Sequence, residues 1–106
     1  NYPITIELNP GQTNIDISDQ PYAGKIRVIQ QTDNTLESLN GLGFFGDRTI
    51  EIRKDEEDGN TLTINPIPSP LPDKIDTDVT INLTKPKEVL GVKFIRGLGL
   101  WRPIYK

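Results

Sequence analysis

The chain has 106 residues and a net charge of -3, and this length suits one domain and excludes two. It contains no cysteine, which excludes disulfides and thiolate metal sites. No apolar run approaches the roughly 20 residues of a transmembrane helix and no signal peptide is visible, so we expect no membrane insertion.

The apolar residues are of the type that favours strands. Ile, Val and Leu dominate and methionine is absent, and β-branched side chains lose less freedom in strands than in helices. Only 34% of the residues are hydrophobic, which is lean for an isolated domain. We therefore expect the core either to be tightly concentrated or to be completed by a second copy of the chain.

Alternation of apolar and polar residues at a period of two marks the strands of the first half. These strands are expected over residues 3–8, 13–18 and 25–31. In the third of them, Ile26 and Val28 face one side and Ile29 faces the other. An apolar residue on both faces predicts a central strand, or one that a neighbour covers.

Residues 32–47 are the least regular part of the chain. Residues 35–39 could form one helical turn, but a run of glycines follows. We expect a loop instead, in which Leu42, Phe44 and Phe45 fold back to cap the core.

The clearest hairpin signal comes next. Residues 49–54 and 60–64 both alternate, and Asp58-Gly59 between them favours the positive dihedrals that hairpin turns require. The following segment, 65–74, has proline at alternate positions, which removes backbone donors and predicts an extended connector or an edge.

The last three strands are expected over residues 79–84, 89–95 and 100–105. Gly91 could form a bulge in the second of them, and Pro103 confines the third to an edge or a bulge. About eight short strands with regular turns predict an all-β fold, a small antiparallel sandwich or barrel-like domain. Because the chain starts at Asn1 and not at methionine, we interpret residues 1–106 as a single domain from a fragment or a processed longer chain.

The residue types needed for catalysis are scarce. Histidine and cysteine are absent, so the usual general base at neutral pH and the thiolate nucleophile are missing. The three serines lack a Gly-x-Ser-x-Gly elbow. A pair of carboxylates remains formally possible, but the acids cluster in turns and on polar strand faces. We expect no enzyme activity and no cofactor.

Two acidic segments could suggest a metal site. The turn 55–60 lacks the residue order and the downstream glutamate of a calcium loop. Asp73, Asp76 and Asp78 only flank the start of a strand. We interpret both segments as solvated turns and expect no metal.

The charge is unevenly spread along the chain. Residues 1–84 carry 14 acids and 6 bases, while residues 85–106 carry 6 bases and one acid. This split can attract an acidic partner, or it can bring two parts of one fold or two subunits together. A pI near 4.8 disfavours nucleic acid as the partner.

The most interesting side chains are three aromatic residues and two arginines near the end of the chain. They form a candidate ligand site or subunit interface: Phe94, Arg96, Trp101, Arg102 and Tyr105. Aromatic rings with arginine can stack on sugars or bases, but a lone tryptophan also suits a core. Alternation places Trp101 and Tyr105 on the same face of the last strand, opposite Leu100 and Ile104, so one of the two faces must meet something other than water.

The order of several elements resembles a pattern of phage tail-fibre and receptor-binding proteins. The elements that carry this resemblance are Gly24–Ile29, Gly59–Pro66, Ile75–Asp76, Val79–Leu83 and Val89–Trp101. The resemblance implies a homotrimeric fibre or spike module of a virion, outside the cell, in which sheets of three chains pack around an axis. No individual binding residue follows from it.

We therefore expect a non-catalytic structural and adhesive module that pairs with copies of itself, as a trimer, and that could contact a host surface receptor such as a glycan. The alternatives are a monomeric carbohydrate-binding or adhesin β-sandwich of a secreted protein, which needs an exposed aromatic platform at Trp101 or Tyr105, and a capsid decoration protein.

Overall fold

The computed structural model describes residues 2–41, 48–54 and 57–106, and within them the chain forms ten strands and no helix. The strands are β1 (Tyr2–Leu8), β2 (Asn14–Asp16), β3 (Ala23–Gln30), β4 (Asn34–Thr35), β5 (Ser38–Asn40), β6 (Arg48–Lys54), β7 (Leu62–Ile64), β8 (Ile81–Leu83), β9 (Glu88–Ile95) and β10 (Leu100–Tyr105). The all-β prediction is confirmed.

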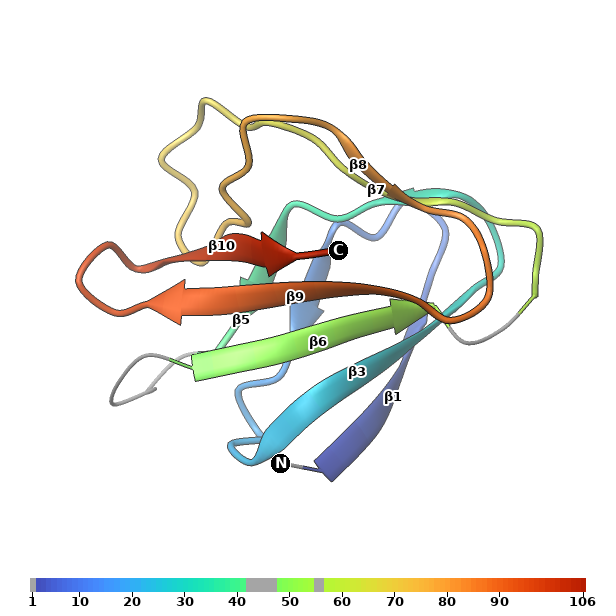
Figure 1. Ribbon diagram of the computed structural model, residues 1–106, viewed down its shortest axis with the longest axis horizontal. Helices are drawn as coiled ribbons and strands as arrows, with labels where there is room; N and C mark the ends of the chain where they lie inside the picture. The colour runs from blue at the N-terminus through green and yellow to red at the C-terminus, as the bar shows by residue number, and fades with distance from the viewer. Residues whose placement is uncertain (1, 42–47, 55–56) are drawn as a thin grey trace.

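The strands form two layers. One layer is a five-stranded sheet in the order β1-β3-β6-β9-β10, which faces the viewer in Figure 1. The other layer consists of a two-stranded sheet, β2-β5, and a three-stranded sheet, β4-β7-β8. The core lies between the layers, so the five-stranded sheet has one inner face and one outer face.

The expected antiparallel arrangement is wrong for a large part of the fold. β1 runs parallel to β3, and β3 runs parallel to β6, while the β6–β9 and β9–β10 pairs are antiparallel. After β6 the chain passes through the opposite layer and returns in the opposite direction as β9. After β1 and again after β3, it passes through the opposite layer and returns in the same direction. Such crossovers produce parallel pairs, and alternation in the sequence reports which face is buried, not which way a strand runs.

The expected hairpin between residues 49–54 and 60–64 is also wrong. β6 pairs with β3 and β9 in the large sheet, whereas β7 pairs with β4 and β8 in the opposite layer. The chain does bend at Gly59, which has a φ of 76°. It carries the chain around a corner between two layers and does not join neighbouring strands.

The segment 32–47 contains two strands that the sequence did not reveal. β4 and β5 are two and three residues long, and the apolar residues of this segment, Leu36 and Leu39, do not alternate at a period of two. Leu36 and Leu39 from this segment are completely buried. The expected cap of Leu42, Phe44 and Phe45 lies outside the described residues.

Several positional predictions hold. β3 is flanked on both sides, by β1 and β6, and β10 lies at the edge of the large sheet. Residues 65–73 form no strand and connect β7 to two isolated bridges, one between Ser38 and Lys74 and one between Ile75 and Trp101. β8 begins at Ile81, not at Val79, because the hydroxyl of Thr77 bonds the backbone of Val79 in a local turn.

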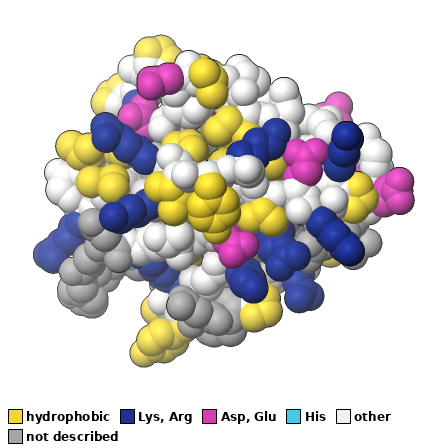
Figure 2. Space-filling view, in the orientation of Figure 1, with side chains coloured by type: hydrophobic (Ala, Val, Ile, Leu, Met, Phe, Trp, Pro, Cys, Tyr) yellow, Lys and Arg dark blue, Asp and Glu magenta, His cyan; other side chains and the backbone are white. Residues whose placement is uncertain are grey.

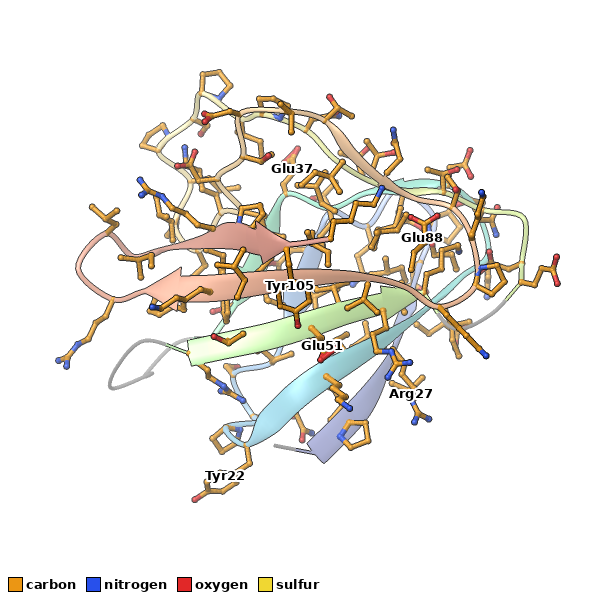
Figure 3. The ribbon with its side chains drawn as sticks, viewed as in Figure 1. Tyr22, Arg27, Glu37, Glu51, Glu88 and Tyr105 are labelled. Atoms are coloured by element: carbon orange, nitrogen blue, oxygen red, sulfur yellow. The ribbon has the colours of Figure 1, made fainter. Side chains whose placement is uncertain are left out.

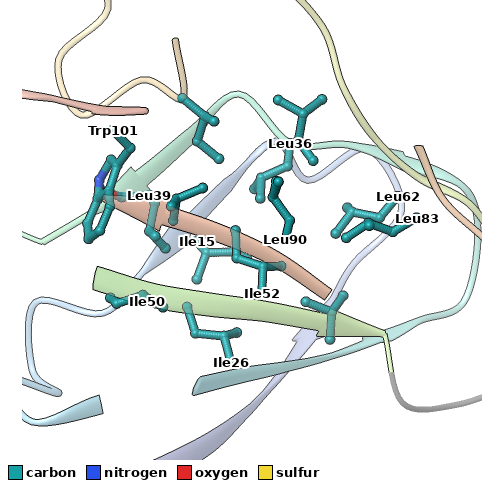
Figure 4. Close-up of a cluster of buried hydrophobic side chains, with 14 of the residues drawn as sticks. Ile15, Ile26, Leu36, Leu39, Ile50, Ile52, Leu62, Leu83, Leu90 and Trp101 are labelled. Carbon is teal, nitrogen blue, oxygen red and sulfur yellow. The ribbon is translucent and has the colours of Figure 1, made fainter. Parts of the chain in front are cut away.

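A single chain closes the core. The buried cluster draws side chains from both layers, and ten of them are labelled in Figure 4: Ile15, Ile26, Leu36, Leu39, Ile50, Ile52, Leu62, Leu83, Leu90 and Trp101. All ten have no exposed surface. The lean composition therefore needs no second copy to complete the core, because nearly all of its Ile, Val and Leu residues on strand inner faces meet the opposite layer.

A buried lysine joins the ends of two central strands. Lys54, the last residue of β6, has no exposed surface, and its Nζ donates to Gln30 Oε1 at 2.9 Å and to Asp58 Oδ1 at 2.6 Å. Gln30, the last residue of β3, donates to Asn34 Oδ1 at 3.2 Å and to Thr61 O at 3.0 Å. Because buried polar groups are costly unless partnered, this network fixes where the chain leaves the large sheet.

Acid is expected to weaken this network through Asp58. Burial raises the pKa of Asp58, but hydrogen bonds from Lys54 and from the backbone N–H of Asn60, together with the charge of Lys54, outweigh it and hold the pKa below its ordinary value of 3.8. A carboxyl group with a lower pKa in the folded chain stabilises the fold fully above its unfolded value. It loses that contribution as the pH falls through its folded value.

We therefore expect the free energy of unfolding, measured by urea titration, to fall as the pH drops below about 4, and to fall less steeply in Asp58→Asn. The variant should already be less stable than the unmodified chain near neutral pH. An acid slope that is the same in both proteins would show that Asp58 does not titrate with folding.

Candidate interaction surface

The structure divides the five candidate residues between the inside and the outside of the chain. Phe94 and Trp101 point into the core and are buried. Arg96, Arg102 and Tyr105 are exposed. Two arginines and the tyrosine therefore lie at the surface, and the phenylalanine and tryptophan rings do not.

Trp101 is a core residue with a fixed polar contact. It has no exposed surface, and its Nε1 donates to the carbonyl oxygen of Leu39 at 2.7 Å. Its ring meets that of Phe94 with centroids 5.2 Å apart and planes tilted by 58°. An aromatic platform around Trp101 is therefore not available in this fold.

Trp101 and Tyr105 lie on opposite faces of the sheet, contrary to the prediction from alternation. Pro103 pairs with Val92, and Tyr105 pairs with Gly91, so Ile104 is an extra residue in β10. This bulge reverses the alternation and turns Tyr105 to the outer face. The bulge expected at Gly91 is thus found on the neighbouring strand.

Gly91 makes room for the ring of Tyr105. A Cβ atom at this glycine would lie within 2.6 Å of three consecutive ring atoms, Cδ2, Cε2 and Cζ, which places the glycine beneath the face of the ring. The hydroxyl points to Glu51 on β6 (Figure 3). Burial, and then the charge and hydrogen bond of Glu51, raise the pKa of Tyr105 above its ordinary value.

A shallow hollow opens beside this ring on the outer face. It has a volume of about 240 Å³ and is lined by Gly24, Lys25, Thr49, Glu51 and Tyr105. The register places Lys25 directly opposite Glu51, and Glu51 directly opposite Gly91. The hollow therefore combines an aromatic ring, a carboxylate, a hydroxyl and an amine from three strands.

The outer face of the large sheet is basic although the chain as a whole is acidic. Strand register places five bases and two acids on this face of the described strands: Lys25, Arg27, Arg53, Lys93 and Arg102, with Glu7 and Glu51. Figure 2 shows Lys and Arg side chains spread around a central apolar patch. The face thus has an excess of three positive charges, which come from both halves of the chain.

A second exposed region follows the edge of the sheet along β10. Its residues, called the β10 surface below, are Leu71, Asp76, Val79, Leu98, Arg102 and Ile104. Leu71 and Leu98 line one hollow, and Asp76, Val79 and Arg102 line another of about 570 Å³. The two hollows flank the bridge between Ile75 and Trp101.

Exposed large apolar side chains gather on this side of the molecule. In the described part of the chain, six such residues are exposed, and five of them belong to β10 or to the segments beside it: Leu71, Val79, Leu98, Ile104 and Tyr105. The sixth, Tyr22, lies in the loop before β3, far from β10 (Figure 3).

The β10 surface also carries paired charges. Arg102 Nε lies 3.6 Å from Asp76 Oδ2, and Lys74 Nζ lies 3.5 Å from Asp76 Oδ1. This is one place where the basic C-terminal segment meets an acid from the rest of the chain. Lys106 instead pairs within that segment, at 3.4 Å from Glu88.

The acidic segments do not form a metal centre in the part of the chain that the structure describes, where no group of three or more carboxylates could hold an ion. Asp58 binds Lys54, and Asp76 binds two bases. Burial raises the pKa of Asp73, and a backbone hydrogen bond from Gly41 opposes this only in part. The described residues also contain no helix that is long and apolar enough to cross a membrane.

Comparison with protein-family models, with curated proteins and with solved structures finds no match to this chain. The site is therefore defined by its own geometry. Sequence reasoning missed Glu51 and Lys25, because their proximity to Tyr105 depends on the parallel β3–β6 pair and on the bulge in β10. It also missed Leu98 and Leu71, which lie in a turn and a proline-rich connector that show no periodicity.

Proposed function

We propose that the chain is a non-catalytic structural and adhesive module that assembles with copies of itself, as a module of a viral fibre or spike does. The observation that carries this proposal is the gathering of exposed apolar side chains on the β10 surface. A contiguous patch of exposed apolar side chains on the surface of a domain is typical of an interaction site.

The core does not account for these side chains, because one chain already buries it. Leu98 is 56% exposed in a turn, and Val79 is 64% exposed in a loop. While both side chains are exposed to water they do not stabilise the single chain, whereas burying them against another chain is favourable. A partner would fill the two hollows that these residues line.

A second copy of the chain suits this surface better than a partner of one charge. Arg102 and Asp76 lie side by side and remain partly exposed, so a copy can present an acid to each base and a base to each acid. Pro103 has no N–H to offer at this edge, so side chains and not added strands would make the contact.

The number of copies and the biological setting rest on the resemblance to phage tail-fibre and receptor-binding proteins. That pattern supports a homotrimer on a virion or outside a cell, with host surface glycans as the adhesive target. The absence of histidine and cysteine supports a role without catalysis.

Charge placed in the β10 surface is expected to prevent assembly. In Leu98→Glu, the carboxylate would have to be buried at the contact, which is costly, so we expect the solution mass from light scattering to fall to that of one chain. Tyr22→Glu is the matched control, because Tyr22 is 71% exposed and lies elsewhere, and it should leave the mass unchanged. Equal masses for the unmodified chain and both variants would refute the assignment of this surface.

A further inference from the structure

We infer that the hollow beside Tyr105 on the outer face of the large sheet is a binding site for an acidic saccharide, with one sugar ring stacked on Tyr105. The inference deepens the adhesive part of the proposed function and assigns it to a surface distinct from the assembly contact. It rests on four features of the hollow, namely the ring, its polar neighbours, its size and the charge around it.

The ring of Tyr105 is a supported, half-exposed platform. One face lies on Gly91, and the residue keeps 47% of its surface exposed. The hydrogen bond to Glu51 fixes the direction in which the ring lies. A preorganised aromatic face loses little freedom when the apolar C–H face of a pyranose packs against it.

The polar groups around the ring match the hydroxyls of a sugar. The carboxylate of Glu51 accepts hydrogen bonds, the hydroxyl of Thr49 both donates and accepts, and the amine of Lys25 donates. All of these residues line the same hollow as Tyr105. Hydrogen bonds to charged groups are the stronger ones, so a carboxylate and an amine at opposite positions can orient a ring that carries several hydroxyls.

The size of the hollow and the charge around it limit the kinds of ligand that would fit. About 240 Å³ is below the roughly 300–1,000 Å³ of pockets that enclose drug-sized ligands, so the hollow suits one sugar unit of a longer chain. Apart from Arg102, which belongs to the β10 surface, the outer face around it has four bases and two acids, and this excess of positive charge favours a ligand with a carboxylate or sulfate on a neighbouring unit.

Titration of the isotope-labelled chain with short oligosaccharides, followed by amide NMR, tests this inference. The acidic probes are sialyllactose, oligogalacturonate and a heparin oligosaccharide, and the neutral counterparts are lactose and maltotriose. We expect at least one acidic probe to shift the amides of Lys25, Gly91 and Tyr105, and to bind at least several-fold more tightly than the neutral probes.

Three variants distinguish stacking of a sugar on Tyr105 from nonspecific binding of the saccharide elsewhere on the surface. Tyr105→Ala should weaken binding at least tenfold. Gly91→Ala should weaken it by displacing the ring, which is still present. Glu51→Gln should weaken it because an NH2 donor replaces one of the two carboxylate oxygens that accept hydrogen bonds. Tyr22→Ala is the control for an exposed tyrosine away from the hollow and should bind as the unmodified chain does.

The outcomes are distinguishable from those of the assembly experiment. Leu98→Glu, which is expected to be a single chain, should still bind the saccharide because the hollow lies on the other side of β10. Absence of shifts with every acidic probe at millimolar concentration would overturn the inference. So would unchanged binding in Tyr105→Ala, or preferential binding of a single-stranded oligonucleotide, whose bases also stack on tyrosine.

Discussion

Replacement of Trp101 by alanine is expected to lower the free energy of unfolding by about 4 kcal/mol, within the range for large aromatic residues in a core. The variant loses the packing of a fully buried ring and its contact with Phe94. It also leaves the carbonyl oxygen of Leu39 without the 2.7 Å hydrogen bond from Nε1. Urea unfolding followed by far-ultraviolet circular dichroism measures the loss.

Trp101→Phe provides a second, milder measurement if the alanine variant does not fold. It keeps an apolar ring but removes the N–H group, and we expect a loss of about 2 kcal/mol, from lost volume and the unpaired carbonyl. Tyr22→Ala should change stability by less than about 0.5 kcal/mol. If the tryptophan variants resembled this surface control, the assignment of Trp101 to the core would be wrong.

Replacement of Lys54 by methionine is expected to cost about 3 kcal/mol, although the two side chains have similar length and methionine is the more apolar. Removing one partner of a buried ion pair leaves the other without compensation. Here the carboxylate of Asp58 would remain, only 17% exposed, and Gln30 would lose its donor.

The double variant Lys54→Met with Asp58→Asn separates charge from packing. It has no unpaired charge, so we expect it to be more stable than Lys54→Met alone. Chemical unfolding of the four proteins in the cycle gives the coupling energy between the two side chains. If the loss in free energy of unfolding of the double variant equalled the sum of the losses of the two single variants, the ion pair would not couple the two sites.

The strands whose residues alternate were predictable from the sequence, because a strand that buries one face has apolar residues at every second position. β1, β3, β6 and β9 all have the inner-face residues that their apolar positions indicate, whereas the bulge in β10 breaks the pattern. β4 and β5 were not predictable, because the apolar residues beside and within them, Leu36 and Leu39, are three positions apart and give no period of two. Their burial depends on Leu36 and Leu39 meeting a layer that is built from distant parts of the chain.

The partners of each strand could not be read from the same pattern. An Asp-Gly turn at residues 58–59 predicted a hairpin, yet it lies at a corner between two layers. At this corner the buried hydrogen bond from Lys54 to Gln30 joins the end of β6 to the end of β3. Alternation also does not indicate whether a strand runs parallel or antiparallel to its neighbour, so the parallel pairs were not predicted.

The candidate site was predictable only in part. The last strand and its arginine and aromatic residues were the right region to consider, but one extra residue, Ile104, sends Trp101 inward and Tyr105 outward. No local signal marks that bulge besides Pro103. The neighbours that give Tyr105 its setting, Glu51 and Lys25, come from strands whose pairing was not foreseen.

We propose that copies of the chain bury the β10 surface against one another. Sedimentation equilibrium of the unmodified chain at micromolar concentration tests it most directly. The result that supports assembly is a mass near three times the 11.9 kDa of one chain. A single species of 11.9 kDa across the whole concentration range would contradict it.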